Sequence, residues 1–195
     1  MGPARMDGGS PGGASPVRLY LQRHAEPVPG HPLDATRPLT SEGRKQAAQM
    51  AAFLVADVGR VDIVISSPFA RAIETAEIMA DALGSYVATT TMLEPDAKPE
   101  DAWNEIERLG QQSQDVLIVG HDPSINLLLA WLINGGSIRF EHAAIAHVTQ
   151  KTMPRNTHEQ VVARLMWFVD PDLVGKEIAD AEVIEAARDL AVELG

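Results

Sequence analysis

Short aliphatic runs alternate along the chain with longer stretches in which apolar positions recur every three or four residues. The aliphatic runs, which predict buried strands, cover residues 17–22, 61–66, 86–92 and 116–119. The stretches with helical spacing cover residues 41–58, 68–83, 99–109 and 123–133. Strands that alternate with helices predict a mostly parallel sheet with helices on both faces. The predicted fold class is therefore a three-layer α/β/α sandwich.

Capping residues indicate where the predicted helices begin. Thr40 is placed to cap the first helix. Ser67 followed by Pro68 has the pattern of an N-cap with proline at the first helical position, and Asp122 followed by Pro123 repeats it. Each of these two signals directly follows a predicted strand, so both predict sharp strand-to-helix junctions.

The last third of the chain departs from this alternation. Residues 143–149 and 161–169 are predicted as two further strands, joined by a polar turn around residues 154–157. A strand pair with so short a connection is antiparallel, and it can supply an antiparallel edge strand to the sheet. Residues 176–194 have helical apolar spacing and are predicted to form a closing amphipathic helix.

The length of 195 residues, 45% of them hydrophobic, fits one domain with a sizeable core. Residues 1–16 are rich in Gly, Pro, Ser and Ala and lack the apolar segment of a secretory signal, so they predict a flexible tail. Residues 17–195 are then a single domain. No apolar stretch approaches the roughly 20 residues that span a bilayer, and cytoplasm is the predicted compartment.

The charge and the absence of cysteine exclude several classes of function. Lys and Arg number 16 against 27 Asp and Glu, giving a net charge of −11. Such a surface does not favour nucleic acid or an anionic membrane as partner. With no cysteine in the chain, disulfides, thiolate nucleophiles and cysteine zinc sites are excluded. The sequence does not indicate an oligomeric state.

Two histidines follow predicted strands, at the sheet edge where open α/β folds bind their ligands. His24 ends the first strand and is preceded by Arg23, while His121 follows residues 116–119. Arg71 follows another strand-to-helix junction. Helix N-termini at such junctions present backbone N–H groups that suit a phosphate.

Each of these residues also has a simpler explanation when taken alone. A single histidine at a strand end is usually a hydrogen-bonded polar residue, and Arg71 has Glu74 and Glu77 nearby as ion-pair partners. Three junctions that each present a cationic or imidazole side chain favour chemistry on a phosphoryl group instead. In such a site one neutral imidazole attacks phosphorus and arginines bind the equatorial oxygens.

Four sequence blocks resemble the histidine phosphatase (phosphoglycerate mutase-like) superfamily in order and spacing. They are Arg23-His24-Ala25-Glu26, Arg37-Pro38-Leu39-Thr40 with Gly43, Ser66-Ser67-Pro68-Phe69-Ala70-Arg71-Ala72 with Thr75-Ala76-Glu77, and Gly120-His121-Asp122-Pro123. The resemblance covers about residues 17–171. The small size and the RPLT and GHDP forms resemble the SixA-like phosphohistidine phosphatase branch.

The resemblance implies a role for each matching residue. His24 is the implied nucleophile, and Arg23, Arg71 and His121 are the implied phosphate pocket. Arg37 is a further candidate for substrate binding, with pairing to Asp34 or Glu42 as the equal alternative. Ala25 stands where the family has glycine, and its side chain is small enough that activity is expected to survive. No metal or cofactor is expected.

The proton donor has the weakest sequence signal. Glu94 follows the third predicted strand and is the nearest match to the mid-chain glutamate of mutase-type relatives, with Asp96 next. A solvated loop carboxylate is the alternative for both residues. Expulsion of an alkoxide needs a positioned acid, whereas a protonated imidazole leaves phosphorus far more easily. A site rich in cations and poor in acids therefore favours cleavage of a P–N bond.

The predicted function is that of a metal-independent phosphatase with a covalent phosphohistidine intermediate, acting on phosphohistidine in a protein. Short loops without a capping insertion favour a phosphorylated protein as partner. The alternative on the same scaffold is a phosphatase of small phosphate esters or nucleotides. The alternative of a different class is an inactive phosphate-binding module, which has no need of a nucleophile.

Overall fold

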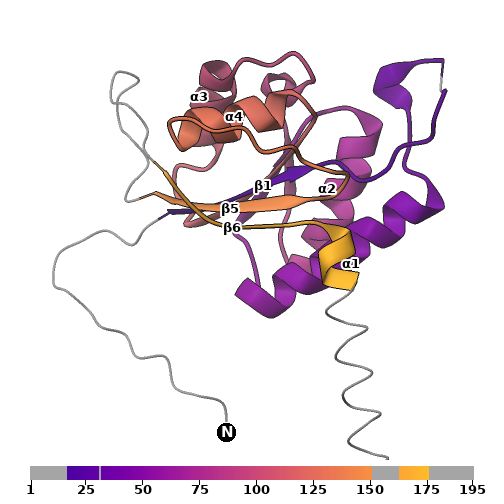
Figure 1. The fold of residues 1–195 in the computed structure, drawn as a ribbon, viewed down its shortest axis with the longest axis horizontal. Coiled ribbons are helices and arrows are strands. Elements are labelled where there is room, and N and C mark those ends of the chain that lie inside the picture. The colour runs from indigo at the N-terminus through magenta and orange to yellow at the C-terminus, as the bar shows by residue number, and fades with distance from the viewer. Residues whose placement is uncertain (1–16, 31, 151–162, 176–195) are drawn as a thin grey trace, which may run out of the picture.

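A six-stranded sheet with the order β3-β2-β4-β1-β5-β6 forms the centre of the computed structural model, which describes residues 17–30, 32–150 and 163–175 (Figure 1). The strands are β1 (Val17–Arg23), β2 (Ile63–Ser66), β3 (Val87–Thr89), β4 (Asp115–Gly120), β5 (Ile145–Gln150) and β6 (Arg164–Val169). The first four are parallel, β5 is antiparallel to β1, and β6 is antiparallel to β5. The predicted mixed sheet is confirmed. The predicted tail (1–16), the turn around 154–157 and the closing helix (176–194) lie outside the described residues.

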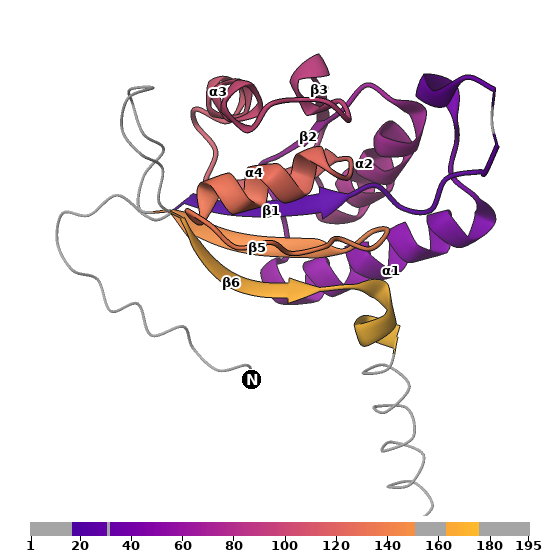
Figure 2. The ribbon, with the colours of Figure 1, turned by 45° about the horizontal axis from the view of Figure 1, so that its top comes forward.

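Helices cover both faces of this sheet. They are α1 (Ser41–Val58), α2 (Ala70–Leu83), α3 (Pro99–Leu109) and α4 (Ser124–Leu132). In Figures 1 and 2, α3 and α4 lie above the sheet and α1 lies below it. No helix of the described residues is long and apolar enough to cross a membrane.

Alternating side chains of β1 build the two halves of the core. Leu19 and Leu21 pack into the cluster under α3 and α4, whereas Tyr20 packs into the cluster under α1 and α2. All three are fully buried, and each of the two leucines contributes about 1.5–3 kcal/mol of transfer free energy. The predicted three-layer architecture is confirmed.

The strand order brings three strand ends together at one edge. Strand β4 lies between β1 and β2, with Arg23 in register with Gly120 and Ser66 with Val119. The residues that follow these strands therefore meet at the carboxyl edge of the parallel strands. Because β5 is antiparallel to β1, the segment that precedes Ile145 arrives at the same edge.

The predicted N-cap of α2 is wrong by two residues. The helix begins at Ala70, and Phe69, in extended conformation, is its N-cap. The Ser67 hydroxyl lies 2.8 Å from Nε2 of His121 and accepts the Phe69 N–H at 3.3 Å. Because that hydroxyl serves a tertiary contact, Ser67 and Pro68 extend the strand-to-helix connection instead of opening the helix.

Asp122 was predicted as the N-cap of α4, and this is also wrong. The helix begins at Ser124, and the residue before it, Pro123, makes no capping hydrogen bond through its side chain. The Asp122 carboxylate accepts a hydrogen bond of 2.7 Å from the side-chain amide of Asn126. Asp122 also lines the cleft described below.

The third strand is shorter than predicted. Of residues 86–92, only Val87–Thr89 pair with β2, and a 3₁₀ turn, η2 (Thr91–Leu93), follows. The Thr90 hydroxyl accepts the backbone N–H of Met92 and stabilises this turn. The chain consequently leaves the sheet early and passes over the edge where the other strands end.

The start of α1 is fixed against the loop that follows β1. The Thr40 hydroxyl accepts the N–H of Gly43 at 2.8 Å, which confirms the predicted cap. A Cβ atom on Gly43 would lie 2.2 Å from the carbonyl oxygen of Glu26, so only glycine permits this approach. The helix therefore supports the backbone two residues beyond His24.

Candidate active site

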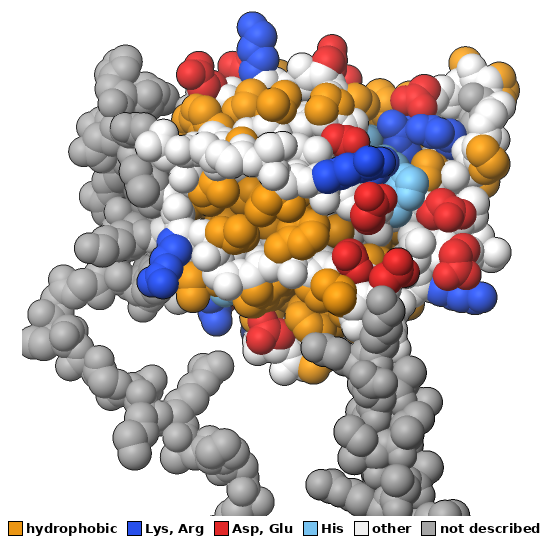
Figure 3. All heavy atoms as spheres, in the orientation of Figure 1, with side chains coloured by type: hydrophobic (Ala, Val, Ile, Leu, Met, Phe, Trp, Pro, Cys, Tyr) orange, Lys and Arg blue, Asp and Glu red, His pale blue; other side chains and the backbone are white. Residues whose placement is uncertain are grey.

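A cleft of about 500 Å³ opens at the carboxyl edge of the parallel strands. It is lined by Arg23, His24, Glu26, Pro27, Pro29, Asp34, Arg37, Arg71, Pro95, His121, Asp122 and His142. Three arginines, three histidines and three carboxylates thus share one opening. In Figure 3, histidine atoms are visible on the surface beside basic and acidic side chains.

His24 lies at the floor of this cleft with a defined tautomer. Its backbone N–H donates to the carbonyl of Gly120 at 3.0 Å, and only 4% of the residue is exposed. Nδ1 donates to the carbonyl of Ala25 at 2.7 Å, because a carbonyl can only accept. Nε2 consequently carries a lone pair, which accepts from Nε of Arg71 at 3.1 Å. Burial lowers the pKa of His24 to about 2, so the ring is neutral at physiological pH.

Ala25 fits beside His24 without backbone strain. Its side chain is fully buried, and its N–H donates to the hydroxyl of Thr75 in α2 at 3.1 Å. The described residues with a side chain and positive φ are Asn134 and Ala143, so Ala25 has an ordinary backbone conformation. An alanine in place of glycine is compatible with this geometry.

Arg71 projects from the first turn of α2 and is fully engaged. Its Nη1 donates to the carbonyl of Asp34 at 2.8 Å, and its Nη2 contacts Oδ2 of the same residue at 3.1 Å. Asp34 belongs to a 3₁₀ turn, η1 (Asp34–Thr36), in the loop after β1. The guanidinium lies 5.1 Å from the centroid of the Phe69 ring. Asp34 thus holds the outer end of Arg71, while Nε of Arg71 faces Nε2 of His24.

His121 faces His24 across the cleft floor. The two ring centroids are 5.0 Å apart, and burial lowers the pKa of His121 to about 3. Its Nε2 bonds to the Ser67 hydroxyl, whereas its Nδ1 is buried and has no hydrogen-bond partner among the described residues.

Two arginine nitrogens of the cleft are also buried without a partner in the described part of the chain. They are Nε of Arg23 and Nε of Arg37. Buried N–H groups are nearly always hydrogen-bonded in folded proteins. The unpartnered guanidinium nitrogens of Arg23 and Arg37, which line the same cleft as His24, therefore mark a place for a ligand rich in acceptor oxygens, such as a phosphoryl group.

The structure brings the four predicted residues His24, Arg23, Arg71 and His121 into this one cleft. Arg37 also lines it, and it contacts Oδ1 of Asp34 at 3.0 Å, as the alternative for this residue proposed.

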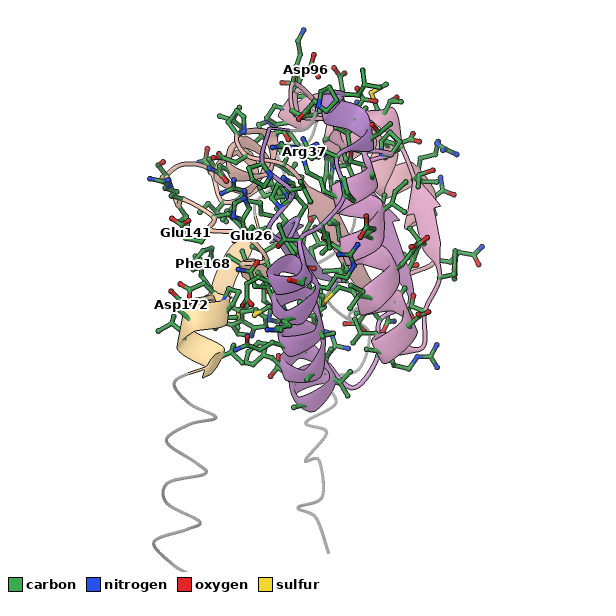
Figure 4. The ribbon with its side chains drawn as sticks, turned by 90° about the vertical axis from the view of Figure 1, so that its right-hand side faces the viewer. Glu26, Arg37, Asp96, Glu141, Phe168 and Asp172 are labelled. Atoms are coloured by element: carbon green, nitrogen blue, oxygen red, sulfur yellow. The ribbon has the colours of Figure 1, made fainter. Side chains whose placement is uncertain are left out.

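The candidate proton donors lie farther out. Pro95 lines the cleft, whereas Glu94 is not among its lining residues. Figure 4 shows Asp96, which is exposed, at the periphery beyond Arg37. A catalytic role for Glu94 stays a prediction.

Sequence reasoning missed His142 altogether. The residue precedes β5, and the start of an antiparallel strand lies at the edge where parallel strands end. Asp34 was considered only as a partner of Arg37, although it also contacts Arg71. Asp122, which was predicted as a cap and belongs to a matching family block but was given no role in the site, lines the cleft as well.

The described residues contain no group of three His, Asp or Glu side chains placed to hold a metal ion.

Known proteins resemble this chain in sequence and in fold. The family model of the histidine phosphatase superfamily (branch 1) matches residues 19–95, which include His24 and Arg71. The chain is 31% identical over 134 residues to the uncharacterised protein Rv1276c of Mycobacterium tuberculosis, covering 68% of this chain and 80% of that protein. The chain belongs to the histidine phosphatase superfamily.

Other members of the histidine phosphatase superfamily indicate the branch. The chain is 28% identical over 137 residues to the phosphohistidine phosphatase SixA of Escherichia coli, covering 68% of this chain and 85% of SixA. A structure of the protein histidine phosphatase SixA complexed with tungstate matches with a TM-score of 0.72 and 26% identity, over 81% of this chain and 99% of that chain. The predicted superfamily and its SixA-like branch are confirmed, and these similarities support phosphatase activity.

Proposed function

We propose that this phosphatase removes the phosphoryl group from phosphohistidine in a protein, through a covalent intermediate on His24. The observation that carries the proposal is the neutral, lone-pair-bearing Nε2 of His24, in a cleft where Nε of Arg23 and Nε of Arg37 have no partner among the described residues. A site that only bound phosphate would gain nothing from a nucleophile held in this tautomer.

In the first step, Nε2 of His24 attacks phosphorus and forms a P–N bond. The bond between phosphorus and the substrate imidazole breaks, and the electron pair leaves with that imidazole, which departs neutral if its other nitrogen is protonated. Nε of Arg71 leaves Nε2 and donates to a phosphoryl oxygen, together with Arg23. Fixed donors of this kind stabilise charge that develops in the transition state.

In the second step, water attacks phosphorus of phosphorylated His24. The new P–O bond replaces the bond to Nε2, inorganic phosphate leaves, and the water proton passes to the phosphate or to solvent. His24 returns to its neutral form, with Nδ1 again bonded to the Ala25 carbonyl. The hydrogen bond to that carbonyl keeps the ring in one orientation through both steps.

The residues that line the cleft around His24 support an imidazole as leaving group. The apolar lining is supplied by Pro27, Pro29 and Pro95, which present flat, rigid surfaces. The carboxylates of Glu26 and Asp122 also line the cleft and suit a substrate imidazole that carries positive charge until its bond to phosphorus breaks. The relatives named phosphohistidine phosphatase point in the same direction.

A trapping and turnover experiment tests the proposal. Wild-type chain and the variant His24→Gln are incubated with a protein phosphorylated on histidine, quenched in alkali, and analysed for acid-labile phosphate. We expect label on His24 of the wild type only, and faster turnover of the phosphohistidine protein than of p-nitrophenyl phosphate or sugar phosphates. Label that persists in His24→Gln contradicts the nucleophile, and a preference for esters by orders of magnitude contradicts the substrate.

A further inference from the structure

Arg23 and Arg71 reach the same cleft but are held by partners of different charge. Arg71 is bound by the carboxylate of Asp34, which also binds Arg37. Arg23 is bound by two neutral acceptors: Nη1 donates to the carbonyl of Phe140 at 2.7 Å, and Nη2 lies 3.1 Å from Nε2 of His142. No described carboxylate lies within ion-pair distance of Arg23.

We propose that His142 is a positioning residue of this site, whose neutral imidazole holds the Arg23 guanidinium against the phosphoryl group without neutralising its charge. The inference rests on the proposed function, because the guanidinium that His142 holds is needed for binding a phosphoryl group. His142 itself lines the cleft, and its ring centroid is 5.6 Å from that of His24.

The backbone next to His142 has an unusual conformation. Ala143 has φ of 62°, in the left-handed region that residues with a side chain rarely adopt. It is held there from both sides, because its N–H donates to the carbonyl of His24 and its carbonyl accepts from the side chain of Gln22. Such strain persists only where surrounding contacts impose it, and it concentrates at functional sites. Here the left-handed conformation of Ala143 turns the chain between the cleft and β5, directly after His142.

The contact fixes the protonation state of His142. A guanidinium N–H can only donate, so Nε2 of His142 must carry a lone pair and the ring proton must lie on Nδ1. A neutral imidazole with its one proton on Nδ1 is a very weak acid. His142 therefore acts through Arg23 and does not supply the proton for the leaving group.

Protonation of His142 removes this support. The imidazolium has no acceptor for Arg23 and adds positive charge beside it. Burial and the charge of Arg23 lower the pKa of His142, while the carboxylates of Glu26 and Glu141 oppose this and Arg37 adds to it. The neutral ring of His24 also lies beside His142, with 5.6 Å between the ring centroids. The fraction of molecules with Arg23 held in place consequently falls at acid pH, below the range in which an ordinary histidine titrates.

The test compares His142→Phe, which keeps a ring but no acceptor, with His142→Gln, which keeps an acceptor but does not titrate. His147→Phe is the matched control, because His147 lies in β5 outside the cleft and stacks on Tyr20 at 4.7 Å. For each variant, kcat/KM with a phosphohistidine protein is measured from pH 5 to 8, together with the affinity for orthovanadate and the melting temperature.

We expect His142→Phe to lower kcat/KM and orthovanadate affinity about tenfold or more, and His142→Gln to retain most of both at pH 7.5. The ratio of kcat/KM in His142→Gln to that in wild type should rise at the acid end of this pH range; this ratio cancels the ionisation of the substrate. His147→Phe should match the wild type.

Three results overturn the inference. They are wild-type values in a folded His142→Phe, a His142→Gln variant as impaired as His142→Phe, and a ratio that does not change with pH. A wild-type chain that turns over none of the phosphorylated substrates contradicts the proposed function instead, and orthovanadate affinity then still decides the role of His142.

Discussion

The two ends of the β1–β4 strand pair use the same residue type in opposite ways. At the amino edge, Arg18 is in register with Asp115 and forms an ion pair with it, and the Tyr20 hydroxyl donates to the same carboxylate at 3.4 Å. At the carboxyl edge, Arg23 is in register with Gly120, which offers no side chain.

The difference separates stability from function within one pair of strands. At the amino edge the charge of Arg18 is paired with the Asp115 carboxylate, so this arginine is not available to bind an anion. The carboxyl edge leaves the charge of Arg23 uncompensated by any described ion-pair partner and leaves its Nε without a hydrogen bond. Polar groups that lack partners, in a fold that otherwise satisfies its polar groups, mark a ligand-binding site.

Removal of the nucleophile should have the largest effect. His24→Gln is expected to lower kcat/KM by about 10³-fold or more, because the covalent path loses its attacking nitrogen. The melting temperature should stay near that of the wild type, since glutamine also places polar atoms in this buried position. Steady-state kinetics measure the loss in kcat/KM, and circular dichroism measures the melting temperature. Activity within tenfold of the wild type would remove His24 from the mechanism.

Arginine geometry should matter at one edge only. Arg71→Lys is expected to lower kcat/KM about 100-fold, because an ammonium cannot face His24 through Nε and bind Asp34 through two further nitrogens. Arg18→Lys, at the other edge, should leave kcat/KM within about twofold. Equal losses in the two variants contradict the division of roles between the edges.

The pH dependence of stability should also come from the carboxyl edge. Burial holds the pKa of His24 at about 2 and that of His121 at about 3, against 6.5 when unfolded. The unfolded chain then binds more protons, so the free energy of unfolding is greatest above pH 6.5 and decreases as the pH falls. Each ring contributes up to about 1.4 kcal/mol per pH unit.

Urea unfolding from pH 7 to 4.5 measures this slope. His142 and His147, whose pKa values burial also lowers, act in the same direction. His24→Gln should be less steep than the wild type by up to one such contribution. A variant slope equal to that of the wild type contradicts the lowered pKa of His24.

The smallest effect is expected at the amino edge. Asp115→Asn removes the partner of Arg18 and weakens the acceptor of the Tyr20 hydroxyl, so the free energy of unfolding should fall by about 1 kcal/mol. The kcat/KM value should not change. Urea unfolding and kinetics at pH 7.5 provide both readings, and a loss of activity with unchanged stability reverses the assignment of the two edges.

The sequence predicted what local signals determine. His24 and His121 were predicted as site residues because each follows an apolar run that must be a buried strand. The carboxyl ends of such parallel strands share one edge. The Thr40 cap was predicted correctly because a capping hydroxyl acts within its own turn. The layers followed from helical and aliphatic spacing, which are also local properties.

The features that were not predicted from the sequence depend on contacts between segments that are distant along the chain. His142 was missed because the composition of β5 does not show its direction, and only an antiparallel strand brings that residue to the cleft. The start of α2 was misplaced because the Ser67 hydroxyl contacts His121, 54 positions away. Asp34 reaches Arg71 across 37 positions from a turn whose path no spacing pattern indicates.

A crystal structure of the wild-type chain with orthovanadate tests most directly whether the carboxyl edge is a phosphoryl site centred on His24. The account predicts vanadium bonded to Nε2 of His24, with its oxygens contacted by Arg23, Arg71 and His121, and Nη2 of Arg23 still bonded to His142. Vanadate bound elsewhere, or held in the cleft without a bond to Nε2 of His24, would contradict it.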